Sequence, residues 1–279
     1  MSDPFLVGKT AWVTGGASGM GRATALGLAA AGADVAVGSL VASQRGAVLA
    51  DQNCHTPDDE KLARTKAEIE AHGVRGLALA LDVCSDESVD VSHRAILAAF
   101  GKVDILINAA GSSARKYIAG HPDEIWHRML DVNLTGPYRT IKRCLPGMIE
   151  RKWGRIVNFA STAANIGYPM HGAYCASKSG LLGLTRCVAL EGAPHGVTCN
   201  ALNPGFVDTD SNLSASRMEI EIAGLEVSVE EYRAQVAQSL PQKRYLKPEE
   251  VGALAVFLCR PEALGIEGQD ITIAMGSQW

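Results

Sequence analysis

Two tyrosine and lysine pairs have a spacing that suits acid–base chemistry. Tyr138 with Lys142, and Tyr174 with Lys178, each form a Tyr-x-x-x-Lys pattern. Residues four apart share one face of a helix, so the ammonium group can lie near the phenol. An opposite charge favours the phenolate and lowers a tyrosine pKa from its usual value of about 10. The pattern is short, so its context must decide between the two pairs.

The context favours Tyr174. This residue begins a predicted helix after the loop that leaves a predicted strand at 155–160, and Ser161 stands at the carboxyl end of that strand. Open α/β sheets bind their ligands at the carboxyl ends of the strands. Tyr138 lies inside a long predicted helix, where we expect a packing or surface role.

A glycine-rich turn near the start of the chain could bind a pyrophosphate. A predicted strand leads into residues 14–21, whose glycines have the spacing Gly-x-x-x-Gly-x-Gly, and a helical segment follows. Such a turn brings backbone N–H groups and the positive end of the helix to the phosphates. Gly19 and Gly21 would open that approach. The sequence therefore predicts nucleotide binding through Gly15, Ser18, Gly19, Met20 and Gly21.

The end of the second predicted strand should distinguish NAD from NADP. Dinucleotide-binding folds place there an acidic residue for the ribose hydroxyls, or a basic residue for a 2′-phosphate. The chain has Ser39 and Leu40 instead, and the nearest basic residue, Arg45, lies further along. Ser39 could bond a ribose and Leu40 could make apolar contact. NAD is the favoured cofactor, with NADP as the alternative.

Short apolar segments alternate with longer segments of helical period along the whole chain. This alternation predicts a doubly wound α/β Rossmann fold, with a seven-stranded parallel sheet and helices on both faces. Strands are expected near 9–13, 34–38, 76–81, 103–107, 155–160, 197–202 and 270–273. Helices are expected near 20–31, 59–72, 86–100, 122–150, 172–192 and 248–259. Because no linker or repeat interrupts the pattern, residues 1–279 are predicted to form a single domain.

Two longer stretches interrupt the tight alternation. Residues 208–247 form a polar, helical segment that we interpret as a substrate lid inserted in the domain, because long loops in such domains often cover a site. Residues 40–58 lengthen the connection after the second strand, and the simpler interpretation is surface variation.

Composition excludes several classes of protein. The net charge is -4, so no basic excess points to nucleic acid or to anionic lipid. The seven cysteines form no C-x-x-C pair and lie mostly in apolar segments, so we expect buried free thiols and no metal site. There is no apolar run of about 18 residues, and the first residues lack a signal-peptide pattern, so a cytoplasmic protein without membrane contact is expected.

The motifs together resemble those of one family, the classical short-chain dehydrogenases/reductases. The resemblance covers essentially the whole chain. Its motifs, in order, are Thr14-Gly15-x-x-x-Gly19-x-Gly21, Asp82-Val83, Asn108-Ala109-Ala110-Gly111, Asn133, Ser161, Tyr174-x-x-x-Lys178 and Pro204-Gly205-x-Val207-x-Thr209.

The resemblance implies a role for each matching residue. Tyr174 would be the general acid/base, Ser161 would polarise the substrate oxygen, and Lys178 would lower the tyrosine pKa and hold the nicotinamide ribose. Asn133 would support a proton relay through water. The cofactor would be contacted by Asp82, Val83, Asn108, Ala109, Ala110, Gly111, Pro204, Gly205, Val207 and Thr209, together with Tyr174 and Lys178. The implied reaction transfers a hydride between a nicotinamide cofactor and a secondary alcohol or ketone.

Some positions depart from the family pattern. Ala109 replaces the usual second asparagine, and Met275-Gly276-Ser277 replaces the frequent Asp-Gly-Gly. Residues 197–260 are similar to those of 3-hydroxybutyrate dehydrogenases, but Ser113 stands where those enzymes carry a glutamine for the substrate carboxylate. That substrate is therefore not inferred.

Four residues are candidates for substrate contact. Ser113 and Arg115 follow the cofactor loop, and Tyr168 and His171 precede Tyr174. Arg115 could attract an anionic substrate, and a small polar or acidic hydroxy compound is the expected class. Two other functions stay open: an enzyme like the sugar-nucleotide epimerases and dehydratases, and a non-catalytic nucleotide sensor. The family resemblance also implies a homo-oligomer, most often a tetramer.

Overall fold

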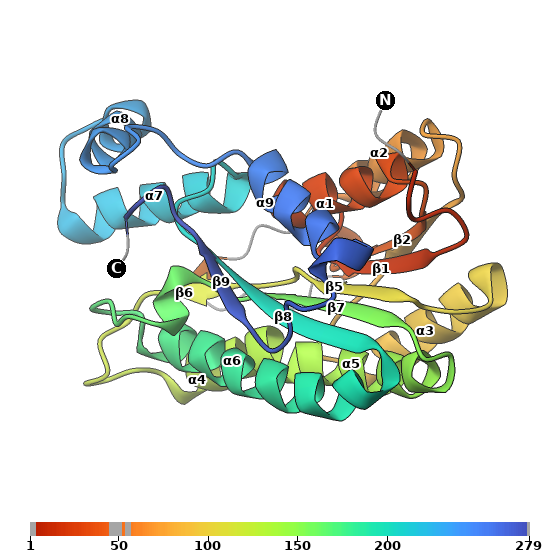
Figure 1. Ribbon diagram of the computed structural model, residues 1–279. Coiled ribbons are helices and arrows are strands. Elements are labelled where there is room, and N and C mark those ends of the chain that lie inside the picture. Colours follow the sequence, from red (N-terminus) through yellow and green to blue (C-terminus); the bar gives the residue numbers. More distant parts are fainter. Residues whose placement is uncertain (1–3, 45–51, 54–56, 278–279) are drawn as a thin grey trace.

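Seven parallel strands form the central sheet of the computed structural model, which describes residues 4–44, 52–53 and 57–277 (Figure 1). Their order across the sheet is β4-β2-β1-β5-β7-β8-β9, and each neighbouring pair is parallel. The strands are β1 (Thr10–Thr14), β2 (Asp34–Ser39), β4 (Gly76–Ala80), β5 (Ile105–Asn108), β7 (Gly154–Phe159), β8 (Val197–Pro204) and β9 (Asp270–Ile273). All seven predicted strands are confirmed, with end points that differ by a few residues.

Helices cover both faces of this sheet, as the alternation predicted. Figure 1 shows α1 (Gly19–Ala30), α2 (Asp59–Glu70) and α9 (Pro248–Phe257) on one face. The other face carries α3 (Asp86–Phe100), α4 (Asp123–Leu130), α5 (Gly136–Glu150) and α6 (Gly172–Gly192). Strand β1 is buried on both sides: Val13 belongs to the core cluster on one face, and Trp12 to the cluster on the other. Strands buried on both faces have nearly continuous apolar sequences, which explains why they were recognisable.

The strand order reverses direction between β1 and β5, and this places the ligand crevice. In doubly wound sheets a crevice opens at such a switch point, outside the carboxyl ends of the strands. Thr14 ends β1, and its hydroxyl oxygen accepts the N–H groups of Ala109 and Ala110, each at 3.2 Å. The glycine turn after β1 is thereby tied to the loop after β5.

The helix predicted at 122–150 is not continuous, and this expectation was wrong in detail. Between α4 and α5 the chain forms a π-helical turn, η2 (Asp131–Thr135), in which the N–H of Gly136 donates to the carbonyl of Asp131, five residues earlier. The next residue, Pro137, has no N–H to donate to the helix. The wider turn is of the kind that often occurs at functional sites.

The two insertions both reach the end of the sheet where the crevice opens. Residues 208–247 contain two helices, α7 (Asp210–Ala223) and α8 (Val229–Ser239), which project beyond the sheet in Figure 1. In the region 40–58, the described residues form η1 (Ala42–Gln44) and the short strand β3 (Gln52–Asn53). Strand β3 pairs antiparallel with β6 (Ser113–Ala114), so this insertion contacts the segment that follows the predicted cofactor loop. Residues 45–51 and 54–56, with Arg45 and Cys54 among them, lie outside the described residues.

The described residues also include short 3-10 helices and free cysteines. Besides η1, the described residues include 3-10 turns at η3 (Thr162–Ala164), η4 (Ala193–His195) and η5 (Pro261–Ala263). The thiols of Cys144, Cys199 and Cys259 are free and buried, as predicted. Cys187 on α6 is exposed, so the expectation of buried thiols was wrong for this residue.

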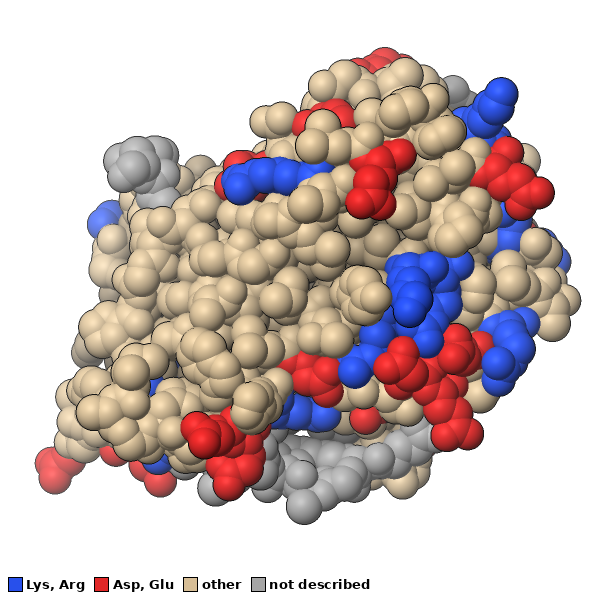
Figure 2. Space-filling model, turned by 90° about the horizontal axis from the view of Figure 1, so that it is seen from below, with Lys and Arg blue, Asp and Glu red and all other residues tan. Residues whose placement is uncertain are grey.

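The face of the molecule that carries α3, α5 and α6 has acidic and basic groups next to each other (Figure 2). Arg139 pairs with Asp86 at 3.1 Å, and Arg143 pairs with Asp90 at 2.9 Å.

In the part of the chain that the structure describes, no helix is both long and apolar enough to span a bilayer.

Candidate active site

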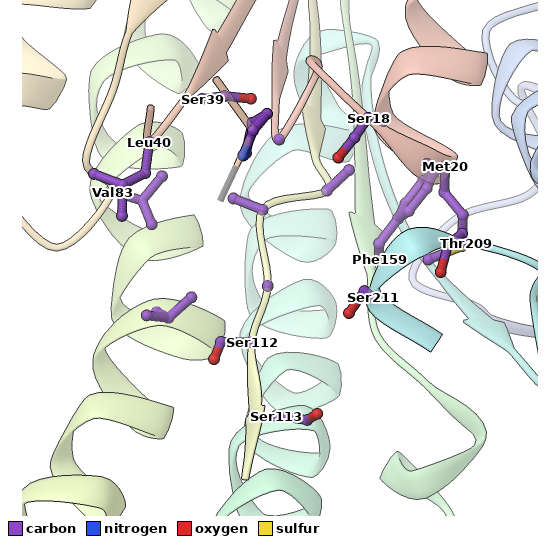
Figure 3. Close-up of a pocket in the computed structure, with 18 of the residues that line it drawn as sticks. Ser18, Met20, Ser39, Leu40, Val83, Ser112, Ser113, Phe159, Thr209 and Ser211 are labelled. Carbon is purple, nitrogen blue, oxygen red and sulfur yellow. The ribbon is translucent and has the colours of Figure 1, made fainter. Parts of the chain in front are cut away.

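The crevice at the switch point is a cleft of about 240 Å³, and most predicted cofactor residues line it (Figure 3). Figure 3 shows Leu40 and Val83 on one side, and Ser18, Met20 and Thr209 on the other. The predicted residues along its wall are Gly15, Ser18, Gly19, Met20, Gly21, Ser39, Leu40, Asp82, Val83, Ala109, Ala110, Gly111, Ser113, Tyr174, Lys178 and Thr209.

The glycine turn is packed so closely that it excludes side chains. A Cβ at Gly21 would lie 2.3 Å from the carbonyl oxygen of Gly15, and a Cβ at Gly15 would lie 2.8 Å from the nitrogen of Ala110. Gly15 and Gly19 also have φ values of +68° and +51°, which favour glycine. The turn therefore presents bare backbone to the cleft at the start of α1, which suits a pyrophosphate.

Ser39 and Leu40 lie at the end of the cleft where the adenosine of a dinucleotide is expected. The Ser39 hydroxyl oxygen accepts the N–H of Ala17 at 3.1 Å, so this serine also fixes the glycine turn. On the same side of the cleft, the carboxylate of Asp82 accepts the N–H of Cys84 at 2.9 Å. The side chains of Leu40 and Val83 provide an apolar wall between these polar groups.

Asn108 differs from its neighbours in the predicted cofactor loop. Its side chain is buried among the strands, where it donates to Asn158 at 2.8 Å and accepts from Thr140 at 2.6 Å. It is not among the described residues that line the cleft, so the prediction of direct cofactor contact is not supported by its position. Its amide holds β5 against β7 and α5, whereas Ala109 and Ala110 face the cleft.

Of the predicted cofactor residues at the end of β8 and after it, only some line the cleft. Thr209 lines the cleft and caps α7, because its hydroxyl oxygen accepts the N–H of Asn212 at 3.1 Å. Val207 is buried in the core and bridges to Leu246. Pro204, Gly205 and Val207 do not line the described cleft.

Asn133 contacts the loop at Ser112 through its side-chain amide. It lies fully buried on η2, and its amide is hydrogen bonded to the N–H and the carbonyl of Ser112 and to the hydroxyl of Ser177. Ser112 lines the cleft next to Gly111. The π-helical turn thus positions the wall of the cleft through one side chain.

Tyr174 and Lys178 line the cleft, and Ser161, which is not among the lining residues, is hydrogen bonded to Tyr174. Ser161 follows β7 and caps η3, while the other two residues lie one turn apart on α6. Lys178 is buried, and its ammonium group donates to the carbonyl of Phe159 at 2.7 Å and lies 5.8 Å from the ring centroid of Tyr174. The end of β7 and the first turn of α6 therefore hold all three side chains.

Burial is the largest cause of the pKa shifts of Tyr174 and Lys178. It raises the pKa of Tyr174, while the hydrogen bond with Ser161 and the positive charge of Arg115 act in the opposite direction. The net shift is upward, which differs from the lowered pKa that the family resemblance implied. Burial also lowers the pKa of Lys178 to about 8. In this environment the neutral phenol of Tyr174 is favoured.

The second Tyr-x-x-x-Lys pair shows that spacing alone does not make a site. Lys142 also lies 5.8 Å from the ring centroid of Tyr138, the same separation as in the first pair. However, Tyr138 is 46% exposed on the outer side of α5 and does not line the cleft. The predicted surface role of Tyr138 agrees with this position.

The substrate candidates Arg115, Tyr168 and His171 form a group beyond the inner end of the cleft. The His171 ring packs edge-on between the rings of Tyr168 and Tyr174, with centroid distances of 6.0 Å and 6.3 Å. Arg115 is buried and forms an ion pair with Glu219 of α7. Burial lowers the pKa of His171, so this ring is favoured in its neutral form.

Several cleft residues were not predicted from the sequence. The described residues that line the cleft but were not predicted are Gly38, Pro57, Leu81, Ser112, Arg128, Val132, Phe159, Ala160, Asp210 and Ser211. Asp210 begins α7 and pairs with Lys61 of α2 at 3.1 Å across the mouth of the cleft. The position of Asp210 directly after Thr209 was an available signal, since a helix start next to a predicted cofactor residue must lie at the same edge.

Taken with the fold, these features define a dinucleotide-binding α/β enzyme. A family model described as "Enoyl-(Acyl carrier protein) reductase" matches residues 15–278. A D-beta-hydroxybutyrate dehydrogenase from Cupriavidus necator is 34% identical over 265 residues, covering 95% of each chain. The chain belongs to the short-chain dehydrogenase/reductase family of NAD(P)-dependent oxidoreductases.

Solved structures extend the likeness to three dimensions. An NAD+-bound xylitol dehydrogenase superposes with a TM-score of 0.84 at 29% identity, covering 97% of this chain and 99% of the other. An actinorhodin polyketide ketoreductase variant with NADPH superposes with a TM-score of 0.85 at 33% identity, covering 96% and 97%. The structural relatives thus include proteins bound to either dinucleotide.

Proposed function

We propose that this protein oxidises a secondary alcohol, or reduces the corresponding ketone, with a nicotinamide dinucleotide. The observation that carries the proposal is that Tyr174 and Lys178 line the same cleft as the glycine turn, while Ser161 is hydrogen bonded to Tyr174. The substrate would lie between Tyr174 and the group formed by Arg115 and His171. When bound, the nicotinamide would accept or supply the hydride.

The residues of this chain would hold the dinucleotide along the cleft. The backbone of the glycine turn would bind the pyrophosphate at the start of α1, and Leu40 and Val83 would enclose the adenine. The ammonium group of Lys178, fixed by the carbonyl of Phe159, would bind the nicotinamide ribose. Thr209 would contact the carboxamide, because it caps the lid helix beside Gly19.

The proton and the charge on oxygen would be handled by two hydroxyl groups. In the reductive direction, Tyr174 donates its phenolic proton to the carbonyl oxygen while negative charge develops there. Ser161 stabilises the same oxygen by a hydrogen bond. In the oxidative direction the phenolate accepts the proton of the alcohol. Asn133 and Lys178 would serve the proton exchange between Tyr174 and solvent.

NAD is the proposed cofactor in preference to NADP. The described residues at the adenosine end offer Ser39, whose hydroxyl already accepts from Ala17, and the apolar Leu40. Arg22, the basic residue that follows the glycine turn, is paired with Glu68 at 2.6 Å. Among the described residues, a 2′-phosphate next to Ser39 and Leu40 would therefore meet a neutral and an apolar side chain and would gain no charge-assisted hydrogen bond from them.

The test is cofactor binding followed by turnover. We expect NAD to bind at least about 10-fold more tightly than NADP, because one charge-assisted contact is worth about 1.5 kcal/mol or more. A panel of hydroxy acids, polyols and secondary alcohols is then monitored by the absorbance of the reduced cofactor. Binding of the dinucleotide without oxidation or reduction of any member would contradict the proposal. Retention of a tightly bound cofactor without net NADH production would favour the epimerase class instead.

A further inference from the structure

A buried arginine lies beside the proposed reacting group. Arg115 is 9% exposed, and its positive charge acts on both Tyr174 and His171. The backbone fixes this proximity: the N–H of Lys116 donates to the carbonyl of Met170 at 2.9 Å, and Lys116 forms a parallel bridge with His171. The loop that carries Arg115 is therefore joined to the loop that precedes Tyr174.

The counter-ion of Arg115 comes from the lid. Its guanidinium donates to the carboxylate of Glu219 on α7 and lies 4.0 Å from the sulfur of Met218. The second carboxylate oxygen of Glu219 accepts the hydroxyl of Tyr232 on α8 at 3.0 Å. A chain of three polar side chains thus connects the substrate loop with both lid helices.

The two members of this ion pair differ in their access to water. The side chain of Arg115 is 10% exposed, whereas that of Glu219 is 31% exposed. A guanidinium buried this deeply needs an anion, because an unpaired charge in the interior is costly. Glu219 can regain hydration with a small movement of α7, whereas Arg115 cannot. Exchange of one carboxylate for another is therefore easier than separation of the charges.

The existing contact also leaves donor capacity on the arginine. A guanidinium has five N–H donors in a plane that matches both oxygens of a carboxylate. The described ion pair uses one oxygen of Glu219, and the other oxygen is bonded to Tyr232. A ligand carboxylate with both oxygens available would make the bidentate contact that Glu219 does not make.

We propose that Arg115 binds the carboxylate of a hydroxy acid or oxo acid substrate, and that Glu219 occupies this position until the substrate displaces it. The inference rests on the proposed function and names its substrate class. The carboxylate would be held by Arg115 while the hydroxyl or carbonyl carbon faces Tyr174. Displacement of Glu219 would also release one contact between the lid and the substrate loop.

The first experiment compares short hydroxy acids with their primary amides, which differ only in the charged group. We expect the wild-type protein to prefer the acid, and Arg115→Gln to lower the ratio of kcat/KM for acid over amide by about 10- to 100-fold, the worth of a hydrogen bond to a charged group. Loss of the Arg115 charge beside Tyr174 affects both substrates alike, so it cancels in this ratio. Arg217→Gln is the matched control, since Arg217 is exposed on α7.

The second experiment has a readout that does not need turnover. Butanoate and butanamide are titrated calorimetrically into the protein saturated with NAD. Glu219→Gln removes the internal competitor and leaves the buried guanidinium without a counter-ion, so butanoate should bind about 3- to 10-fold more tightly. Glu221→Gln, at an exposed position two residues along α7, should bind butanoate like the wild type. Because this experiment uses Glu219→Gln, it still tests the proposal if Arg115→Gln does not fold.

The outcomes separate this inference from the proposed function. Equal use of acids and amides by the wild type, or unchanged or weaker butanoate binding by Glu219→Gln, would overturn the inference and identify the ion pair as a lid contact only. Failure to oxidise or reduce any alcohol, acid, amide or ketone would overturn the proposed function, while tighter butanoate binding by Glu219→Gln would still support a carboxylate site at Arg115.

Discussion

Asn133 is hydrogen bonded through both ends of its amide to the backbone of Ser112. The amide oxygen accepts the N–H of Ser112 at 3.0 Å, and the amide nitrogen donates to its carbonyl at 2.9 Å. Asn133 can make this contact because it lies on the π-helical turn η2, next to the loop that lines the cleft. The relationship makes the amide a support for the cleft wall in addition to the relay role that the family resemblance implies.

Asn133→Ala is therefore expected to affect both stability and binding. The substitution removes the two buried hydrogen bonds from the Asn133 amide to the N–H and the carbonyl of Ser112, which should lower the free energy of unfolding by about 2 to 4 kcal/mol. Cofactor affinity should fall as well, because the loop at Gly111 and Ser112 loses its anchor. Urea unfolding and NAD titration measure the two effects. Asn165→Ala, at an exposed position, is the control, and a loss below about 1 kcal/mol in Asn133→Ala would contradict the support role.

The glycine turn gives a second prediction. Gly21→Ala places a Cβ 2.3 Å from the carbonyl oxygen of Gly15, so the two arms of the turn must separate. We expect NAD affinity to fall by at least about 10-fold, because the backbone groups that would bind the pyrophosphate are displaced. Fluorescence titration with NAD measures this loss.

The matched control uses the same substitution in a helix with free space. A Cβ at Gly183 of α6 meets no described atom within 4 Å. Gly183→Ala should keep NAD affinity and should stabilise the helix by up to about 1 kcal/mol. If both variants bind NAD equally well, the turn does not form the cofactor site.

Chemistry at Tyr174 gives a third prediction, for which the chain supplies its own control. Tyr174→Phe removes the proton donor and should lower kcat by about 100- to 10,000-fold, the usual range for general acid–base catalysis. Tyr138→Phe removes the same hydroxyl from the other Tyr-x-x-x-Lys pair and should change kcat by less than about 2-fold. NAD affinity should be similar in both variants. Comparable kcat losses in the two variants would show that Tyr174 has no special role.

Much of the fold was predictable because it depends on local sequence. Each strand buried on both faces is an apolar segment of four to eight residues, and each crossover helix follows at the expected distance. The glycine turn and the choice of Tyr174 over Tyr138 followed from the same logic, since the predicted strands place both at the carboxyl edge of the sheet. Local sequence patterns therefore located the carboxyl edge of the sheet and the glycine turn, whereas Asp82, Val83 and Thr209 were assigned through the family resemblance.

The remaining features depend on contacts between distant residues. Arg115 and Glu219 are 104 residues apart, and no sequence pattern predicts that they form a pair. The pairing of β3 with β6 and the π-helical turn likewise arise from tertiary packing, which overrides local propensity. Asn108 was assigned to the cofactor by its motif, but the neighbouring Asn158 and Thr140 hold its side chain in the core.

The last prediction concerns the buried ammonium group of Lys178. Burial lowers its pKa from 10.5 to about 8 in the folded protein, whereas the unfolded chain keeps the ordinary value. Below pH 8 the lysine is protonated in both states, so the folded state bears the full cost of burying the charge. Between pH 8 and pH 10.5 the unfolded chain binds more protons, and stability must therefore rise with pH in this window.

Lys178→Met removes the ammonium group and with it this pH dependence of stability. The contribution of Lys178 is therefore the difference between the wild type and Lys178→Met. The free energy of unfolding of the wild type, relative to that of Lys178→Met, should increase by about 3 kcal/mol from pH 7 to above pH 10, because each pKa unit corresponds to about 1.4 kcal/mol. Urea unfolding without added cofactor at several pH values measures the difference. Lys142→Met, at the other pair, should follow the wild type throughout. A difference for Lys178→Met that stays constant with pH would mean that the ammonium group is hydrated in the folded protein.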